Sequence, residues 1–133
     1  MAKTFGEMVA EARAHVPGIS PAEARARVER NPQTLLLDVQ DGSDIAACGL
    51  IPGAVPISLG MLAVRADSEL PAQFSDARLR DRSRPVIVTC GAGGQAALGA
   101  YTLQQMGFSD VAFIDGGMAA WKEAGLPTEP YRP

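Results

Sequence analysis

The sequence predicts an α/β fold with a mostly parallel central sheet. Stretches of strand length alternate with helical stretches along the chain, which is the order that parallel sheets require. Three of the strand-like stretches are apolar at almost every position, as in strands that are covered on both faces. With 133 residues, 47% of them hydrophobic and 20% charged, the chain is expected to form one compact domain over residues 1–133.

Two helices are expected before the first strand. Residues 5–15 are rich in Ala and Glu, which favours a helix. Ser20 followed by Pro21 is typical of an N-cap with proline at the first helical position. This second helix should extend to about Arg30, and residues 34–39 should then form a central, buried strand.

The rest of the chain continues this alternation. From their patterns we expect helices at residues 41–47, 59–65, 95–106 and 118–124, and strands at 55–58, 85–89 and 111–115. Residues 67–84 carry many Asp and Arg side chains. We interpret them as solvated turns with a short helix, not as a functional charged patch.

Charge and cysteine content exclude some classes of function. Twelve Lys and Arg against fifteen Asp and Glu give a net charge of -3, so no nucleic-acid partner is expected. Cys48 and Cys90 do not form a Cys-x-x-Cys pair, and a structural zinc site is therefore excluded. Cys48 lies at a predicted helix end and is not expected to be a second reactive thiol. The one histidine, His15, is interpreted as a helix-end side chain, not as a catalytic base.

Neither a targeting segment nor a membrane span is expected in this sequence. Residues 1–16 contain four charged side chains between Lys3 and Arg13 and lack the apolar core of a signal peptide, so the cytoplasm is the expected compartment. Residues 85–109 contain no charged side chain and are long enough to span a bilayer. Because glycines and glutamines interrupt them, a buried strand, a glycine loop and a packed helix explain this stretch better.

Candidate functional residues follow the apolar strands. In parallel α/β sheets ligands bind beyond the carboxyl ends of the strands, where this chain has Asp38, Cys90 and Asp115. Cys90 is distinctive because a loop of small residues and a long predicted helix follow it directly. The loop consists of Gly91, Ala92, Gly93, Gly94, Gln95 and Ala96.

Such a loop can curl so that its backbone N–H groups surround one anion, with the positive end of the following helix dipole behind them. A thiol at the first position is then favoured as the thiolate, which is the nucleophilic form. Cys90 is therefore a candidate nucleophile. The competing interpretation is that Cys90 ends a buried strand and that the glycines only form a turn.

Four motifs in order resemble single-domain rhodanese-like proteins. They are LLLDVQ at 35–40, IPGA at 51–54, IVTCGAGGQA at 87–96, and the segment from GGMAAW at 116–121 to GLP at 125–127. The resemblance covers residues 19–127, leaves a helical N-terminal extension at 1 to about 18, and implies a three-layer fold. It also implies that Cys90 takes a sulfane sulfur as a persulfide and passes it to a nucleophilic acceptor, with residues 91–96 as the N–H cradle.

The chain departs from the family pattern in the loop itself. Gln95 stands where many active members carry Arg, and Ala96 stands where Ser is common. The loop therefore lacks a fixed positive charge and a hydroxyl group, and an anionic donor loses a binding partner. Arg13 and Arg65 are the candidates to approach the mouth of the site and supply the missing charge.

Further departures and motifs have structural interpretations. Gln40 stands where Arg usually follows in the family, which predicts that an ion pair of Asp38 is missing or rerouted and that Asp38 is structural. Gly116 and Gly117 are interpreted as a strand-to-helix turn. Trp121 is expected to be a core residue, not a ligand platform.

Three functions therefore compete. The first is a cytoplasmic sulfurtransferase that uses a Cys90 persulfide, without metal or organic cofactor, to carry sulfur from a small anion such as thiosulfate, or from a persulfide, to a thiol or cyanide. The second is a non-catalytic rhodanese-like module that binds a partner or a small anion, because Gln95 replaces the loop Arg. The third is a cysteine phosphatase or arsenate reductase, which would need an arginine at the position of Ala96 and a general acid.

Overall fold

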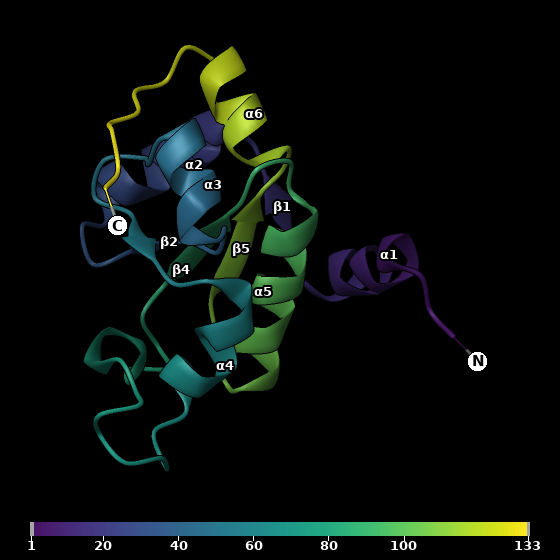
Figure 1. The fold of residues 1–133 in the computed structure, drawn as a ribbon, viewed down its shortest axis with the longest axis vertical. Helices are drawn as coiled ribbons and strands as arrows, with labels where there is room; N and C mark the ends of the chain where they lie inside the picture. Colours follow the sequence, from purple (N-terminus) through teal and green to yellow (C-terminus); the bar gives the residue numbers. More distant parts are fainter. Residues whose placement is uncertain (1, 133) are drawn as a thin grey trace.

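The computed structural model describes residues 2–132 and is built around a five-stranded sheet in which every pair of neighbouring strands is parallel (Figure 1). The strand order is β1-β5-β4-β2-β3. The strands are β1 (Gly18–Ile19), β2 (Leu35–Asp38), β3 (Val55–Pro56), β4 (Val86–Thr89) and β5 (Val111–Ile114). The helices are α1 (Phe5–His15), α2 (Pro21–Arg30), α3 (Gly42–Cys48), α4 (Leu59–Ala66), α5 (Gly94–Gln105) and α6 (Gly117–Glu123), with a 3-10 turn, η1 (Ala77–Leu79). The predicted α/β class is confirmed.

Helices cover both faces of the sheet. Side chains alternate between the two faces along each strand, so each strand contributes apolar residues to both faces. On one face Leu37, Val88 and Phe113 pack with residues of α1, α4 and α5. On the other face Leu36 and Ile87 pack with residues of α2, α3 and α6. Figure 1 shows these two groups of helices around the strands. The three layers explain why the strands are apolar at consecutive positions.

Local capping signals set the starts of the first two helices. The Thr4 hydroxyl accepts the backbone N–H of Glu7 at 3.1 Å, and the Glu7 carboxylate accepts the N–H of Thr4 at 3.2 Å, which forms a capping box. Ser20 Oγ accepts the N–H of Glu23 at 3.1 Å, and Pro21 is the first residue of α2. Helices α1 and α2 span the residues that the sequence predicted.

Strand β1 was not predicted. Its two residues, Gly18 and Ile19, are too few to show a hydrophobic period. The strand pairs with β5 at the edge of the sheet, where Gly18 lies opposite Phe113. A Cβ on Gly18 would lie 2.8 Å from the Phe113 ring, so the glycine leaves room for that ring to lie across β1.

Arg82 anchors the polar segment 67–84. Its guanidinium donates to the carbonyl oxygens of Ala66 at 2.6 Å and Met106 at 3.0 Å, and also to that of Leu79. The segment forms turns and the short η1, as expected. The hydrogen bonds of Arg82 to three backbone carbonyl groups therefore give this basic residue a structural role.

The uncharged stretch at residues 85–109 divides into structural elements as predicted. It contains β4, the loop that begins at Cys90, and all of α5. Within residues 2–132, no helix combines the length and the apolarity needed to cross a bilayer.

Candidate functional site

The ends of two strands bring Asp38 and Cys90 to the same edge of the sheet. Strands β2 and β4 are parallel neighbours, and their register pairs Asp38 with Thr89, the residue before Cys90. Asp115 follows β5, which lies on the other side of β4. The sheet therefore aligns the three strand-end residues that the sequence singled out.

The loop after β4 curls around the Cys90 thiol. The backbone N–H groups of Gly93 and Ala96 donate to Cys90 Sγ at N–S distances of 3.0 and 3.2 Å. Gly93, the N-cap of α5, has a φ of +106°, in the left-handed region that favours glycine. The Cys90 residue is 2% exposed. Its sulfur therefore lies at the N-terminus of α5, where N–H donors and the helix dipole both favour a negative charge.

The N-terminus of α6 holds the loop from the other side. The N–H of Met118 donates to the Cys90 carbonyl at 2.7 Å, and the N–H of Ala119 donates to the Gly91 carbonyl at 3.0 Å. A Cβ on Gly117 would lie 2.3 Å from the Cys90 carbonyl oxygen, and the φ of Gly117 is +57°. The glycine pair that begins α6 is a strand-to-helix turn, as interpreted from the sequence, and it also allows α6 to contact the Cys90 loop.

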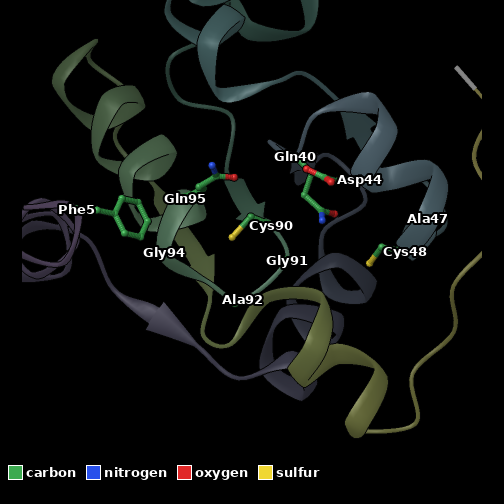
Figure 2. Close-up of a pocket in the computed structure, with 10 residues that line it drawn as sticks. All are labelled: Phe5, Gln40, Asp44, Ala47, Cys48, Cys90, Gly91, Ala92, Gly94 and Gln95. Carbon is green, nitrogen blue, oxygen red and sulfur yellow. The ribbon is translucent and has the colours of Figure 1, made fainter.

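The Cys90 loop forms one side of an open pocket with a volume of about 630 Å³ (Figure 2). The lining residues are Phe5, Gln40, Asp44, Ala47, Cys48, Cys90, Gly91, Ala92, Gly94 and Gln95. Four of the six predicted loop residues thus line the pocket, while Gly93 and Ala96 are buried and donate to the sulfur. Asp44 is the only residue with a carboxylate in this lining, and none of the lining residues is basic.

Comparison with known proteins identifies the family. Residues 20–124 match the model of the rhodanese-like domain. The chain belongs to this family. One curated relative, thiosulfate sulfurtransferase GlpE of Pseudomonas fluorescens, is 34% identical over 104 residues, which are 78% of this chain and 83% of the relative. Two other curated relatives, each 30% identical, are longer proteins, and the chain spans 33% and 40% of their lengths.

Solved structures share this rhodanese-like fold over nearly the whole chain. A protein of unknown function from Rhodopseudomonas palustris, described as a "possible tyrosine phosphatase", has a TM-score of 0.89 at 29% identity and covers 97% of this chain and 96% of its own. The polysulfide-sulfur transferase homodimer from Wolinella succinogenes has a TM-score of 0.73 at 31% identity and covers 96% of this chain and 88% of its own. Both similarities extend beyond residues 20–124 of the family match.

In this rhodanese-like domain the neutral amide of Gln40 lies beside the Asp38 carboxylate. Asp38 is 0% exposed, and its Oδ1 accepts the backbone N–H of Gln40 at 3.0 Å. In the amide orientation that satisfies its hydrogen bonds, Gln40 Nε2 also donates to both carboxylate oxygens, at 3.3 and 3.2 Å. Burial raises the pKa of Asp38 to about 6, and the Gln40 N–H opposes that shift. The buried Asp38 carboxylate therefore holds Gln40, a residue of the pocket lining, in place through hydrogen bonds.

Neither arginine proposed to replace the loop charge reaches the pocket. The Arg13 guanidinium donates to both carboxylate oxygens of Asp115, at 3.1 and 3.3 Å, and this contact lowers the pKa of Asp115. Arg65 Nη1 donates to the Phe74 carbonyl at 2.7 Å. Both side chains are absent from the lining of the Cys90 pocket, so the expectation that either supplies the missing charge is not met.

The structure confirms two structural interpretations. His15 lies at the end of α1, where its ring stacks on Tyr101 with the centroids 4.6 Å apart, and it does not line the Cys90 pocket. Trp121 is 3% exposed and donates its Nε1–H to the Pro127 carbonyl at 2.8 Å. Both residues therefore belong to the scaffold.

The other walls of the pocket were not foreseen from the sequence. Phe5 comes from α1, and its ring lies so close to Gly94 that a Cβ there would be 2.9 Å from it. Asp44 and Ala47 come from exposed positions on α3, where nothing in the local sequence distinguishes them. Cys48, at the end of the same helix, also lines the pocket. A second cysteine and an aromatic residue at the start of a predicted helix were the only sequence signals.

Proposed function

We propose that this rhodanese-like domain is a sulfurtransferase that carries sulfur on Cys90 as a persulfide. The position of Cys90 Sγ is the main support: it lies at the floor of an open pocket and accepts two backbone N–H groups. Two relatives that are named sulfur transferases, one for thiosulfate and one for polysulfide, support the same class of reaction. Residues 91–96 are the proposed substrate cradle, the donor is thiosulfate or a persulfide, and the acceptor is a thiol or cyanide.

The proposed reaction has two steps. The Cys90 thiolate attacks the sulfane sulfur of the donor, the donor S–S bond breaks, and the donor remainder leaves with that electron pair, as sulfite in the case of thiosulfate. An acceptor thiolate or cyanide then attacks the outer sulfur of the Cys90 persulfide. The new bond forms to the acceptor, and the electron pair of the broken S–S bond returns to Cys90 Sγ. The N–H groups of Gly93 and Ala96 would stabilise that returning charge.

Intact-mass spectrometry tests this proposal directly. Protein exposed to thiosulfate, or to a persulfide donor, is expected to gain the mass of one sulfur atom and to lose it again when cyanide is added. No gain with either donor would contradict the sulfurtransferase and favour the non-catalytic binding module. The pocket offers one observation for that module, because none of its lining residues carries the positive charge that an anionic donor prefers.

A phosphatase is less well supported, although the description of one structural relative raises it. A phosphoryl group needs bidentate, positively charged recognition of its oxygens. At the corresponding place in this loop is Ala96, which is buried and contributes only its N–H to Cys90 Sγ. We therefore expect no hydrolysis of p-nitrophenyl phosphate, and measurable hydrolysis that depends on Cys90 would contradict the sulfurtransferase.

The Cys48→Ala variant is expected to load and discharge sulfur like the wild type. Although Cys48 lines the pocket, it lies at the C-terminal end of α3 and has neither a glycine loop around it nor the N-terminus of a long helix beside it. Single-turnover loading and discharge, followed by intact mass, check this prediction. A variant that loads Cys90 but cannot discharge would show instead that Cys48 is a resolving thiol.

A further inference from the structure

The charge distribution in the pocket bears on the substrate. Asp44 contributes its only carboxylate, and the other lining residues are the two cysteines and uncharged Phe, Gln, Ala and Gly residues. Two basic side chains have other partners: Arg13 pairs with Asp115, and Lys122, outside the lining, donates to the backbone carbonyl of Cys48. Among the lining residues an anion therefore meets a carboxylate and no basic side chain.

The apolar part of the pocket lining favours an organic molecule. In the view of Figure 2, Phe5 lies on one side of Cys90, next to Gly94, and Asp44 lies on the other side, next to Gln40. Phe5 and Ala92 add exposed apolar surface to the lining. A small thiol can place its carbon chain against this surface while its sulfur approaches Cys90.

The geometry points to Asp44 as a specificity-determining residue that selects amine-bearing thiols as the sulfur acceptors of this domain. This inference rests on the proposed sulfurtransferase function. An ammonium group on the acceptor would lie near the Asp44 carboxylate while the acceptor thiolate attacks the outer sulfur of the Cys90 persulfide. The acceptor leaves as a persulfide, and the electron pair of the broken S–S bond returns to Cys90, so that atoms and charges balance. Asp44 takes no part in these bonds and acts only through its charge.

The expected effect is moderate because Asp44 is exposed to solvent. At such a site a single negative charge changes the rate of reaction with a singly charged molecule by about threefold. It raises the rate for a cation and lowers the rate for an anion. The ratio of rates for a cationic and an anionic acceptor should therefore change by about tenfold when the charge is removed. Added salt should reduce this change.

A single-turnover discharge experiment with the full chain tests the inference. Protein loaded with sulfur and freed of donor is mixed with cysteamine, 2-mercaptoethanol or 3-mercaptopropionate, which carry a positive charge, no charge and a negative charge beside the thiol. The loss of one sulfur atom is followed by intact mass. Each rate is compared between the wild type and Asp44→Asn, so that the intrinsic reactivity of each thiol cancels. Asp41→Asn is the matched control, because Asp41 is an exposed aspartate at the start of the same helix that does not line the pocket.

In Asp44→Asn the discharge by cysteamine is expected to slow and that by 3-mercaptopropionate to accelerate, with 2-mercaptoethanol unchanged. Asp44→Lys should invert the preference, and Asp41→Asn should leave it as in the wild type. The wild type, Asp44→Asn and Asp44→Lys could all load with sulfur and show the same ratio of discharge rates for cysteamine and 3-mercaptopropionate. That result would overturn the role of Asp44 while leaving the sulfurtransferase intact. A wild-type protein that never loads would overturn both proposals.

Discussion

The Cys90→Ser variant is expected to take up no sulfur and to form no thiocyanate from cyanide, while it keeps the wild-type fold. A serine hydroxyl fits the same buried position and can accept the N–H groups of Gly93 and Ala96. It cannot form a persulfide, because that requires the nucleophilic sulfur of a thiolate. The loss should therefore be complete and not a fraction of the wild-type rate.

Thiocyanate formation in steady state and intact mass after loading measure this effect, and a thermal unfolding curve checks the fold. Cys48→Ser is the matched control, because it makes the same chemical change at the other cysteine of the pocket. It should keep the wild-type mass gain. Equal turnover by the wild type and Cys90→Ser would end the sulfurtransferase interpretation.

The Gln95→Arg variant is expected to lower the thiosulfate KM. Gln95 lines the pocket and is exposed, and its amide is neutral. An arginine there would add a charge-assisted hydrogen bond to a sulfonate oxygen, worth about 1–2 kcal/mol after allowance for solvent. That corresponds to roughly a tenfold gain in affinity for a dianionic donor. The gain should be smaller for an uncharged or bulky persulfide donor and should shrink as salt rises.

The measurement is kcat/KM for thiosulfate and for a persulfide donor at two ionic strengths. Gln105→Arg is the matched control, since it adds the same charge at an exposed position at the far end of α5. An unchanged thiosulfate KM both in Gln95→Arg and in its combination with Asp44→Asn would show that residue 95 does not contact the donor. Asp44 lines the same pocket, so the new arginine could pair with Asp44 instead of the donor. A decrease in the thiosulfate KM that appears only in the Gln95→Arg, Asp44→Asn double variant would reveal that pair.

The sequence by itself determined the α/β class, the central strands of the sheet and the candidate nucleophile. The apolar runs that became β2, β4 and β5 are short, local and covered on both faces, so their composition alone identified them. The Cys90 loop was equally local: its glycines directly follow a strand and precede α5, and the N–H groups of Gly93 and Ala96 do bond to the sulfur. Helix starts at Thr4 and Ser20 were encoded by adjacent capping residues.

Only the tertiary structure decided which residues surround that cysteine. Phe5 and Asp44 reach the pocket from helices that lie far from Cys90 in the sequence, and their local patterns describe ordinary exposed helix positions. Arg13 pairs with Asp115 because the fold brings α1 close to the end of β5, a segment far away in the sequence. Propensity and capping act over a few residues, whereas the charge and shape of a pocket depend on which distant segments pack together.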